Sequence, residues 1–389
     1  MISCKNVHIV TNLYTGGAEM MLYKLLSHIN RERFEPIVVS LMDEGTLGDC
    51  LEALDISVYT INMKRGLPTI PSFWQLIHTL SQIQPDLIQG WMYHGNLAAQ
   101  LTSYFLHTSI SVSVLWNIRH SLYSLDYERA RTRFIIQLST QLSNFPQKVI
   151  YNSRVAASQH ESIGYCHDNT VVIPNGFDTE KFAPSSGARM SVRKELRISI
   201  NTILIGLIGR YHSMKDHDNF LQAAASLRKH CPDIDIQFLL VGRGVNWDNQ
   251  HLYKLIKELG LTEKIHLLGE RKDIPRLSAA LDIAASASYS EAFPNVIGEA
   301  MSCGVPCVVT DVGDSAWIVG NTGRIVPPRN PQLLARGWKE LIDMGAEPRK
   351  ALGKAARDRI IGNFSLGSVV AQYESLYENV LARKLKEKS

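Results

Sequence analysis

The chain has 389 residues, of which 45% are hydrophobic and 20% are charged, and its formal net charge is +4. This length exceeds that of a usual single core, so we expect two domains of a globular protein. No apolar run approaches the roughly 18–20 residues of a membrane span, and the N-terminus lacks the pattern of a secretion signal. We therefore expect a protein inside the cell.

The charge is divided unevenly between the two halves. Residues 1–180 hold 12 Lys and Arg against 15 Asp and Glu, a balance of −3, whereas residues 181–389 hold 29 against 22, a balance of +7. An excess of this size suits an anionic ligand but is too diffuse for a nucleic-acid-binding surface. The six cysteines lack metal-type spacing, and Cys303 and Cys307 are typical of small buried residues, so neither a disulfide framework nor a metal site is expected.

The first half alternates short apolar runs with amphipathic stretches, a pattern that predicts a parallel sheet covered by helices. The expected strands are Val7–Val10, Ile37–Leu41, Val58–Ile61, Leu87–Gln89, Val112–Trp116, Val149–Tyr151 and Val171–Ile173. The expected helices are Glu19–Ile29, Phe73–Ile83, Leu97–Leu106 and Ala130–Leu142. We expect a Rossmann-like domain over residues 1–180.

The second half repeats this architecture after turn-rich stretches at residues 174–178 and 184–187, which favour a domain boundary. The expected strands are Ile203–Ile208, Ile236–Val241, Ile265–Leu268, Ile283–Ala285 and Cys307–Val309. The expected helices are Asn219–Lys229, Leu252–Leu259, Val296–Cys303, Leu333–Met344, Arg349–Ile360 and Val369–Leu381. We expect a second Rossmann-like domain over residues 181–365 and a helical segment, 366–389, that crosses back to the first domain.

Two carboxylates, Glu291 and Glu299, bracket an expected turn from strand to helix. The apolar run 282–287 precedes them, and Pro294 stands where the helix would begin. Both side chains can face one crevice at the carboxyl end of a parallel sheet, where open α/β folds bind ligands. Equally, Glu299 can be an acid favoured by the helix dipole and Glu291 a solvated loop residue.

Further candidates follow other expected strands. Gly16 and Gly17 open a helix after the first strand and offer bare backbone N–H groups to a phosphate, although the pattern is not that of a dinucleotide site. Arg210 and Lys215 follow the first strand of the second half, and two such cations can neutralise a pyrophosphate without a metal. The alternative for each cation is a solvated surface position.

Together these motifs resemble the family-4 glycosyltransferases of the GT-B fold, a retaining class that uses nucleotide sugars. The resemblance rests on the segments 16–19, 172–178, 209–215, 240–242, 291–301, 304–311 and 323–328, which occur in the family's order along nearly the whole chain. The segment 91–98 is similar to the bacterial surface-polysaccharide branch. The resemblance implies two facing Rossmann-like domains with a deep cleft between them.

The resemblance also implies roles on the donor side. Arg210 and Lys215 would hold the donor diphosphate and stabilise it as it leaves, Glu299 would bond the ribose, and Glu291 would face the sugar. The remaining donor-binding candidates are Gly16 and Gly17 at the phosphate or sugar, the backbone of Phe293, Pro294 and Asn295 around the sugar, and the loop at Arg271 near the base.

His120 resembles the family's sugar-facing histidine and is a catalytic candidate with Arg210, Lys215 and Glu291. Asn117 or Arg119 can be aligned at its position instead. His94, Arg119 and Asn175 are acceptor-side candidates. The chain departs from the family at Ala292 and Asp216, where many members have glycine. If the position of Ala292 needs a positive φ, the sugar pocket must differ.

The resemblance implies transfer of a sugar, with retained configuration, from a nucleotide sugar to a hydroxyl of a lipid-linked or polysaccharide acceptor. UDP is favoured as the nucleotide, no cofactor or metal is expected, and no nucleic acid is a partner. A nucleotide-sugar-binding protein without transfer and a UDP-sugar epimerase remain alternatives. Arg119, Arg129, Arg131 and Arg133 with residues 134–136 form a basic and apolar cluster that suits peripheral contact with the inner membrane face, or else a partly buried helix with a solvated edge.

Overall fold

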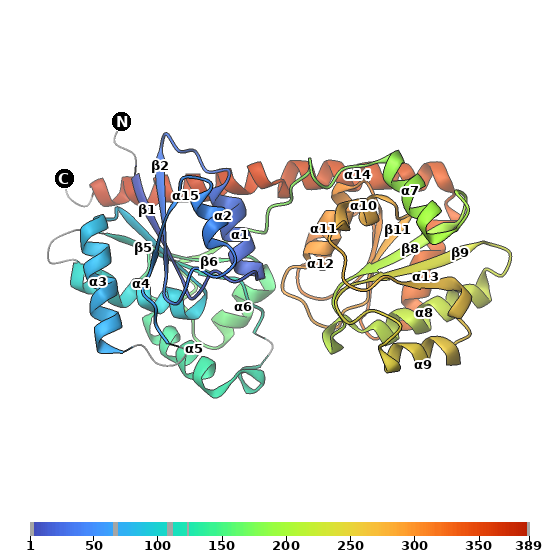
Figure 1. Ribbon diagram of the computed structural model, residues 1–389, viewed down its shortest axis with the longest axis horizontal. Coiled ribbons are helices and arrows are strands. Elements are labelled where there is room, and N and C mark those ends of the chain that lie inside the picture. Colours follow the sequence, from blue (N-terminus) through green and yellow to red (C-terminus); the bar gives the residue numbers. More distant parts are fainter. Residues whose placement is uncertain (1–3, 65–68, 107–111, 123, 387–389) are drawn as a thin grey trace. The chain divides into compact units, whose positions relative to one another are not determined.

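The computed structural model describes residues 4–64, 69–106, 112–122 and 124–386. The chain divides into two compact units (Figure 1). The first unit contains Met1–Gly176 together with Val369–Ser389, and the second contains Phe177–Ser368. Within the described ranges, no helix combines the length and hydropathy needed to cross a bilayer.

The first unit is built on a seven-stranded sheet in the order β3-β2-β1-β4-β5-β6-β7, and every pairing in it is parallel. Its strands are β1 (Cys4–Val10), β2 (Phe34–Ser40), β3 (Ser57–Thr60), β4 (Leu87–Trp91), β5 (Ser113–Ile118), β6 (Lys148–Tyr151) and β7 (Thr170–Val172). Its helices are α1 (Gly17–Leu26), α2 (Gly48–Glu52), α3 (Ile70–Ile83), α4 (Met92–Leu106), η1 (Leu125–Tyr127), α5 (Ala130–Leu142) and α6 (Arg154–Ser162). The central strands β4 and β5 are buried throughout, as expected of a sheet covered on both faces.

The second unit holds a six-stranded parallel sheet in the order β10-β9-β8-β11-β12-β13. Its strands are β8 (Ile203–Ile208), β9 (Ile236–Val241), β10 (Ile265–Leu267), β11 (Ile283–Ser286), β12 (Cys307–Thr310) and β13 (Arg324–Val326). Its helices are α7 (Ser186–Leu196), η2 (Ser213–Lys215), α8 (His217–His230), α9 (Gln250–Glu258), η3 (Thr262–Lys264), α10 (Ile274–Ala279), α11 (Asn295–Ser302), α12 (Ser315–Val319), α13 (Pro331–Asp343) and α14 (Ala346–Phe364). Two Rossmann-like parallel sheets in one chain confirm the predicted fold class.

Several elements were not predicted from the sequence. The strand β13 is only three residues long and ends just before Pro327, so its pattern is too short to stand out. The helix α7 lies where turn residues predicted a boundary loop, and Ser185 caps that helix by accepting a hydrogen bond from the backbone N–H of Ala188 at 3.1 Å. The small helices α2, α6, α10 and α12 were also missed.

The last helix, α15 (Leu366–Lys386), groups with the first unit from Val369 onward. Tyr373 and Tyr377 are buried there, and their hydroxyls reach side chains of the sheet. Asn117 Nδ2 donates to Tyr373 Oη at 2.9 Å, and Tyr377 Oη donates to Gln89 Oε1 at 2.7 Å. These contacts fix the helix against β4 and β5.

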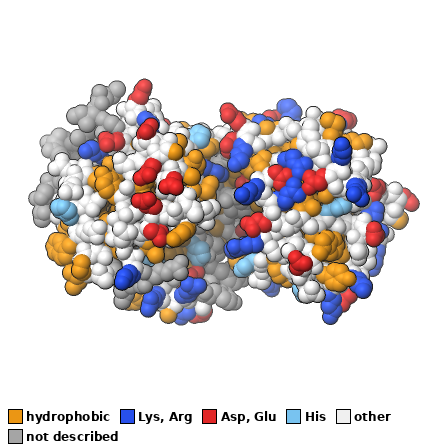
Figure 2. Space-filling view, viewed as in Figure 1, with side chains coloured by type: hydrophobic (Ala, Val, Ile, Leu, Met, Phe, Trp, Pro, Cys, Tyr) orange, Lys and Arg blue, Asp and Glu red, His pale blue; other side chains and the backbone are white. Residues whose placement is uncertain are grey.

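Many cations of the second half lie in ion pairs with acidic side chains. Figure 2 shows Lys and Arg side chains intermixed with acidic ones where α10 lies in Figure 1. There Arg271 and Arg276 both bond Asp273 and Glu195, at 2.6 to 2.9 Å. The positive balance of this half is therefore not one continuous anion-binding surface.

Candidate functional site

Each sheet has one point where the order of its strands reverses, and the predicted site residues follow the strands that meet there. In the first sheet this point lies between β1 and β4, and in the second it lies between β8 and β11. Ligands of doubly wound sheets bind outside the carboxyl ends of such strands.

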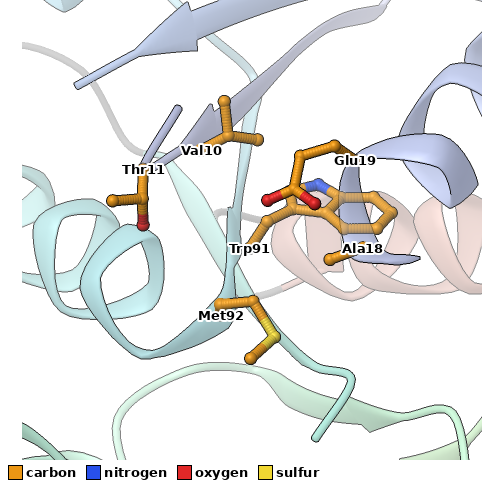
Figure 3. Close-up of a pocket in the computed structure, with 6 residues that line it drawn as sticks. All are labelled: Val10, Thr11, Ala18, Glu19, Trp91 and Met92. Carbon is orange, nitrogen blue, oxygen red and sulfur yellow. The ribbon is translucent and has the colours of Figure 1, made fainter. Parts of the chain in front are cut away.

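A small pocket opens at the reversal point of the first sheet (Figure 3). It is lined by Val10, Thr11, Ala18, Glu19, Trp91 and Met92. Gly16 caps α1 and Gly17 begins it, with no atom near the space that a side chain at Gly17 would occupy. The Glu19 carboxylate folds back over Gly16, and burial raises the pKa of Glu19. The predicted phosphate-facing glycines therefore share their helix end with an acid that the sequence reasoning did not single out.

The junction between β4 and α4 is strained, because Met92 adopts a φ of +60°. The turn starts α4 immediately after β4 and places Met92 in the pocket wall beside Trp91. His94 lies in the first turn of this helix and is half-buried, which lowers its pKa. Strained backbone conformations of this kind are common at functional sites.

Arg119 follows β5, and its guanidinium is engaged by the surrounding fold. Nη1 donates to Tyr373 Oη at 3.0 Å, Nη2 donates to Asn175 Oδ1, and the group lies 5.7 Å from the centre of the Trp91 ring. Asn175 is itself buried. These two acceptor-side candidates therefore meet each other in the first unit.

His120 is the more accessible neighbour, with its side chain 40% exposed. Its Nδ1 lies 3.3 Å from Tyr93 Oη, and its Nε2 lies 3.6 Å from Glu128 Oε1. Asn117, the alternative to His120 in the alignment, is fully buried and bonded to Asn96 and Tyr373. Of these two side chains, only that of His120 is accessible to a ligand.

At the reversal point of the second sheet, Lys215 and Glu291 form an ion pair. Lys215 Nζ lies 2.5 Å from Glu291 Oε1, and the two side chains are 24% and 15% exposed. Ser288 Oγ donates to the same carboxylate oxygen at 2.8 Å. The backbone N–H of Tyr289 donates to the carbonyl of Met214 at 3.0 Å, which joins the two loops. A cation and a carboxylate from different loops are thus placed side by side.

Arg210 is exposed and follows Gly209, where a Cβ would lie 3.6 Å from Lys215 Cδ. Within the described part of the chain, Arg210 makes no ion pair or side-chain hydrogen bond. Arg329, which the sequence reasoning missed, places its guanidinium 4.1 Å from the centre of the Tyr289 ring. Because Arg329 follows β13 by only three residues, the edge gains a further cation from an unpredicted strand. Arg210 is the cation that an arriving anion meets without displacing a partner.

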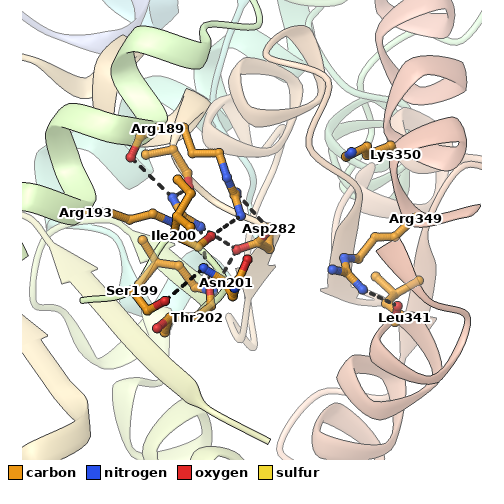
Figure 4. Close-up of polar contacts among 12 residues, drawn as sticks. Arg189, Arg193, Ser199, Ile200, Asn201, Thr202, Asp282, Leu341, Arg349 and Lys350 are labelled. Carbon is orange, nitrogen blue, oxygen red and sulfur yellow. Dashed lines mark hydrogen bonds and ion pairs between the residues drawn. The ribbon is translucent and has the colours of Figure 1, made fainter. Parts of the chain in front are cut away.

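The loop that carries Glu291 follows β11, and that strand is anchored at its beginning by a buried ion cluster (Figure 4). Asp282 accepts from Arg193 Nη2 at 2.7 Å, from Arg189 Nη1 at 2.8 Å and from the backbone N–H of Leu204 at 2.9 Å. Arg193 is only 2% exposed and also donates to the carbonyl of Ala280 at 2.8 Å. The cluster joins α7 to strands β8 and β11.

Asp216, where the resemblance leads us to expect glycine, has a φ of +50° and caps α8. Its Oδ1 accepts from the backbone N–H of Asn219 at 3.3 Å, and burial raises its pKa. The left-handed backbone explains why glycine suits this position, and aspartate is among the few other residues that tolerate it. The Asp216 carboxylate caps α8, so aspartate is accommodated at this position in place of glycine.

We expect Asp216→Ala to lower the free energy of unfolding by about 2 kcal/mol, since it removes a cap and strains a positive φ. Asp216→Gly should cost less than about 0.5 kcal/mol, because glycine adopts this backbone without strain. Denaturant titration of the two variants measures the difference. Equal losses in both variants would contradict the role of the positive φ.

The aromatic ring at the start of α11 packs into the core. Phe293 is 6% exposed and stacks on Phe177 with centroids 6.0 Å apart. Pro294 is the N-cap residue, Asn295 is exposed, and Glu299 is half-buried on the helix. Ala292 is absent from the described non-glycine residues with positive φ. Alanine is therefore accommodated at this position without the strain of a positive φ.

Arg271 does not point a free cation at a ligand. Its Nε and Nη2 donate to the two oxygens of Asp273 at 2.8 and 2.9 Å, and Nη1 donates to Glu195 at 2.8 Å. Side chains of these two acids hold the pKa of Arg271 above its usual value. The predicted place of this loop near the base therefore does not rest on a free Arg271 guanidinium.

The described residues contain no group of three or more His, Cys, Asp and Glu side chains placed to hold a metal ion. Cys303 and Cys307 are free and buried, and burial raises the pKa of Cys303 to about 12. Both thiols are therefore small core residues, as expected.

Two parallel doubly wound sheets, each with polar and glycine-rich segments at its reversal point, define the GT-B class of fold. Two family descriptions match the chain, Glycosyltransferase Family 4 over residues 15–181 and Glycosyl transferases group 1 over residues 202–344. The chain therefore belongs to the group 1/family 4 glycosyltransferases, as the resemblance predicted.

Known proteins of similar sequence and fold support this assignment. The D-inositol 3-phosphate glycosyltransferase of Corynebacterium aurimucosum is 28% identical over 286 residues, covering 71% of this chain and 66% of that protein. The UDP-Gal:alpha-D-GlcNAc-diphosphoundecaprenol alpha-1,3-galactosyltransferase of Escherichia coli is 28% identical over 215 residues, 55% of each chain. The crystal structure of Anabaena HepE with UDP has a TM-score of 0.83 at 24% identity, covering 96% of this chain and all of that one. The chain thus spans about half to two thirds of the length of these two sequence relatives.

Proposed function

We propose that the chain is a retaining glycosyltransferase that moves a sugar from a UDP-sugar to a hydroxyl of a lipid-linked or polysaccharide acceptor in cell-surface glycan biosynthesis. The observation that carries the proposal is the joining of Lys215 and Glu291, beside the exposed Arg210, at the reversal point of the second sheet. The Escherichia coli relative is named for a UDP-galactose donor and a lipid diphosphate acceptor, and HepE was crystallised with UDP.

On the donor side, the diphosphate binds Arg210 first, because that guanidinium has no partner to give up. Lys215 then shares its ammonium between Glu291 and the phosphate, while the carboxylate turns its other oxygen to the sugar. As the bond to the sugar breaks, charge gathers on the diphosphate, and these preorganised cations stabilise it without a metal. Glu299 bonds the ribose, and the backbone of residues 293–295 lines the sugar.

Transfer with retention follows from attack on the same face that the diphosphate leaves. The leaving phosphate oxygen accepts the proton of the acceptor hydroxyl, so no second protein carboxylate is required. Glu299 is assigned to the ribose, which removes it as the partner of Glu291 in a double displacement. His120, whose side chain is 40% exposed, is assigned to the catalytic residues as the one that faces the sugar. His94 is assigned to the acceptor side, together with Arg119 and Asn175, which hold the surrounding loops together. Gly16 and Gly17 are assigned to the phosphate or sugar of the donor.

An assay of nucleoside diphosphate release separates this proposal from the alternatives. The purified protein is incubated with UDP-glucose, UDP-galactose and UDP-N-acetylglucosamine, with and without polyprenyl diphosphate sugars. We expect UDP release that depends on the acceptor. Binding of UDP-sugars without release under any acceptor would instead favour a binding protein, and conversion of one UDP-sugar into its epimer would favour an epimerase.

We also propose peripheral contact of the first unit with an anionic membrane surface. Phe134 is 61% exposed on α5 and Leu138 is 37% exposed one turn later, whereas Ile136 lies in the core and takes no part. Arg129 and Arg131 are exposed beside Phe134. An apolar side chain among cations is the pattern of an interfacial helix.

Reversal of charge at Arg129, Arg131 and Arg133 should abolish sedimentation with vesicles that contain anionic lipid, since each basic residue contributes about 1 kcal/mol near such a surface. The matched control reverses Lys350 and Lys354, which are 73% and 80% exposed on α14. The control should sediment like the wild type. Equal binding by all three proteins would count against the α5 surface.

A further inference from the structure

A chain of hydrogen bonds runs through the first unit and ends at His120. It begins at His160, which lies on α6 and is fully buried. His160 Nδ1 is 2.7 Å from the carbonyl oxygen of Ala156. Because a carbonyl oxygen can only accept, Nδ1 carries a proton. Burial lowers the pKa of His160 to about 4, so the ring is neutral and its Nε2 has a free lone pair.

Tyr93 links His160 to His120 and fixes the direction of the second hydrogen bond. Its Oη is 2.8 Å from His160 Nε2, and since that nitrogen accepts, the phenol donates its only proton there. Burial raises the pKa of Tyr93, which keeps the phenol protonated. At its second contact, 3.3 Å from His120 Nδ1, Tyr93 Oη can therefore only accept. The proton in this bond belongs to His120.

We propose that Tyr93 and His160 are positioning residues that hold His120 with its proton on Nδ1, so that the lone pair of Nε2 is offered to a hydroxyl of a bound sugar. The inference rests on the proposed function and adds to it the direction of one hydrogen bond. In a neutral imidazole, the nitrogen that carries the proton is set by the bond that the other nitrogen makes. The exposed nitrogen then accepts, which selects a hydroxyl over a carbonyl or phosphate oxygen.

The Glu128 carboxylate also faces Nε2, with its Oε1 3.6 Å away, and disfavours an anionic ligand group at the same place. Its charge favours a proton on Nε2, so the Tyr93 contact at Nδ1 acts against it in setting the tautomer. Protonation of His120 would reverse the polarity of Nε2, which would then donate to Glu128 and cease to accept from a sugar. The other titratable groups packed around the chain are Tyr151 and Tyr165, whose rings lie 5.3 and 5.1 Å from that of His160. Burial raises the pKa of both, so they stay neutral.

The tautomer of His120 can be measured without any ligand. Protein labelled with ¹⁵N-histidine is studied by NMR at alkaline pH, where histidine side chains are neutral, and the His120 signals are assigned from their loss in His120→Gln. We expect the pattern of a ring protonated on Nδ1 in the wild type and a shift toward Nε2 protonation in Tyr93→Phe. A wild-type ring protonated on Nε2, or no change in Tyr93→Phe, would overturn the proposal.

Tyr165→Phe is the matched control, because it removes a buried hydroxyl from the same cluster, 3.5 Å from the carbonyl of Ile136, without touching His120. It should leave the NMR pattern of His120 unchanged. If Tyr165→Phe shifted the tautomer as Tyr93→Phe does, the cause would be a general loss of packing in the cluster, and the proposal would be overturned.

A second readout uses transfer itself. Tyr93→Phe should lower kcat/KM about five- to tenfold, the usual effect of one hydrogen bond, and should have no further effect when His120 is already alanine. Additive losses in the double variant would show that Tyr93 acts independently of His120. If no nucleotide sugar is turned over by the wild type, the proposed function fails, whereas the tautomer in ligand-free protein is decided separately.

Discussion

Lys215→Ala is expected to lower kcat/KM for sugar transfer by about 10²–10³, because removal of one group that stabilises a developing oxyanion costs about 2.7–4 kcal/mol. The ammonium that Glu291 holds at 2.5 Å is then missing when charge gathers on the departing diphosphate. Glu291→Gln should reduce transfer in the same direction, since a neutral amide no longer holds the ammonium in place. Steady-state kinetics with a UDP-sugar and a lipid-linked acceptor measure both effects.

The matched control for this result is Lys254→Ala. Lys254 is 78% exposed on α9 and lies 3.8 Å from Glu258, a contact worth about 0.5 kcal/mol or less. It should leave both transfer and unfolding unchanged. Unfolding of Lys215→Ala at the wild-type midpoint shows that its fold is retained. Transfer by that variant within a few-fold of the wild type would contradict the assignment of Lys215.

Asp282→Ala is expected to lower the free energy of unfolding of the second unit by about 3–5 kcal/mol, the usual cost of breaking a buried ion pair from one side. The substitution leaves Arg193, which is 2% exposed, without its carboxylate, and it also removes the acceptor of the Leu204 N–H. Denaturant titration followed by circular dichroism measures the loss. We expect a shifted midpoint for the second unit and an unshifted one for the first.

Asp343→Ala provides the comparison, because Asp343 pairs with Lys339 at 2.6 Å on the exposed side of α13. An exposed pair of this kind contributes about 0.5 kcal/mol or less. A loss in Asp282→Ala as small as that in Asp343→Ala would mean that the buried cluster does not hold α7 to the sheet.

The sequence predicted the two sheets well because each central strand is an apolar run between turn residues, such as Ile203–Ile208 and Ile236–Val241, and both were placed to the residue. The strand β13 was not predicted because three residues cannot establish a period. The helix α7 was not predicted because its capping serine and the glycine that follows have the composition of a turn. Local pattern therefore decided which elements were found.

The polar contacts could not be predicted in the same way. Lys215 and Glu291 are 76 residues apart, and Tyr93 and His160 are 67 apart, so only the folded chain brings them together. Motif resemblance selected Lys215, Glu291 and His120. Tyr93 lies in the matched segment 91–98 but was given no role of its own, and His160 lies outside the matched segments. One of the two acids that bind the Arg271 guanidinium, Glu195, lies on α7, which the sequence did not reveal as a helix.

The central claim is that the cations at the carboxyl edge of the second sheet bind the diphosphate of the donor. Calorimetric titration of UDP and of uridine into the wild type, Arg210→Ala and Lys215→Ala tests it most directly. We predict that each substitution weakens UDP binding about 10- to 150-fold, as expected for loss of a charged hydrogen bond of about 1.5–3 kcal/mol, and leaves uridine binding unchanged. Equal affinity of all three proteins for UDP would contradict the claim.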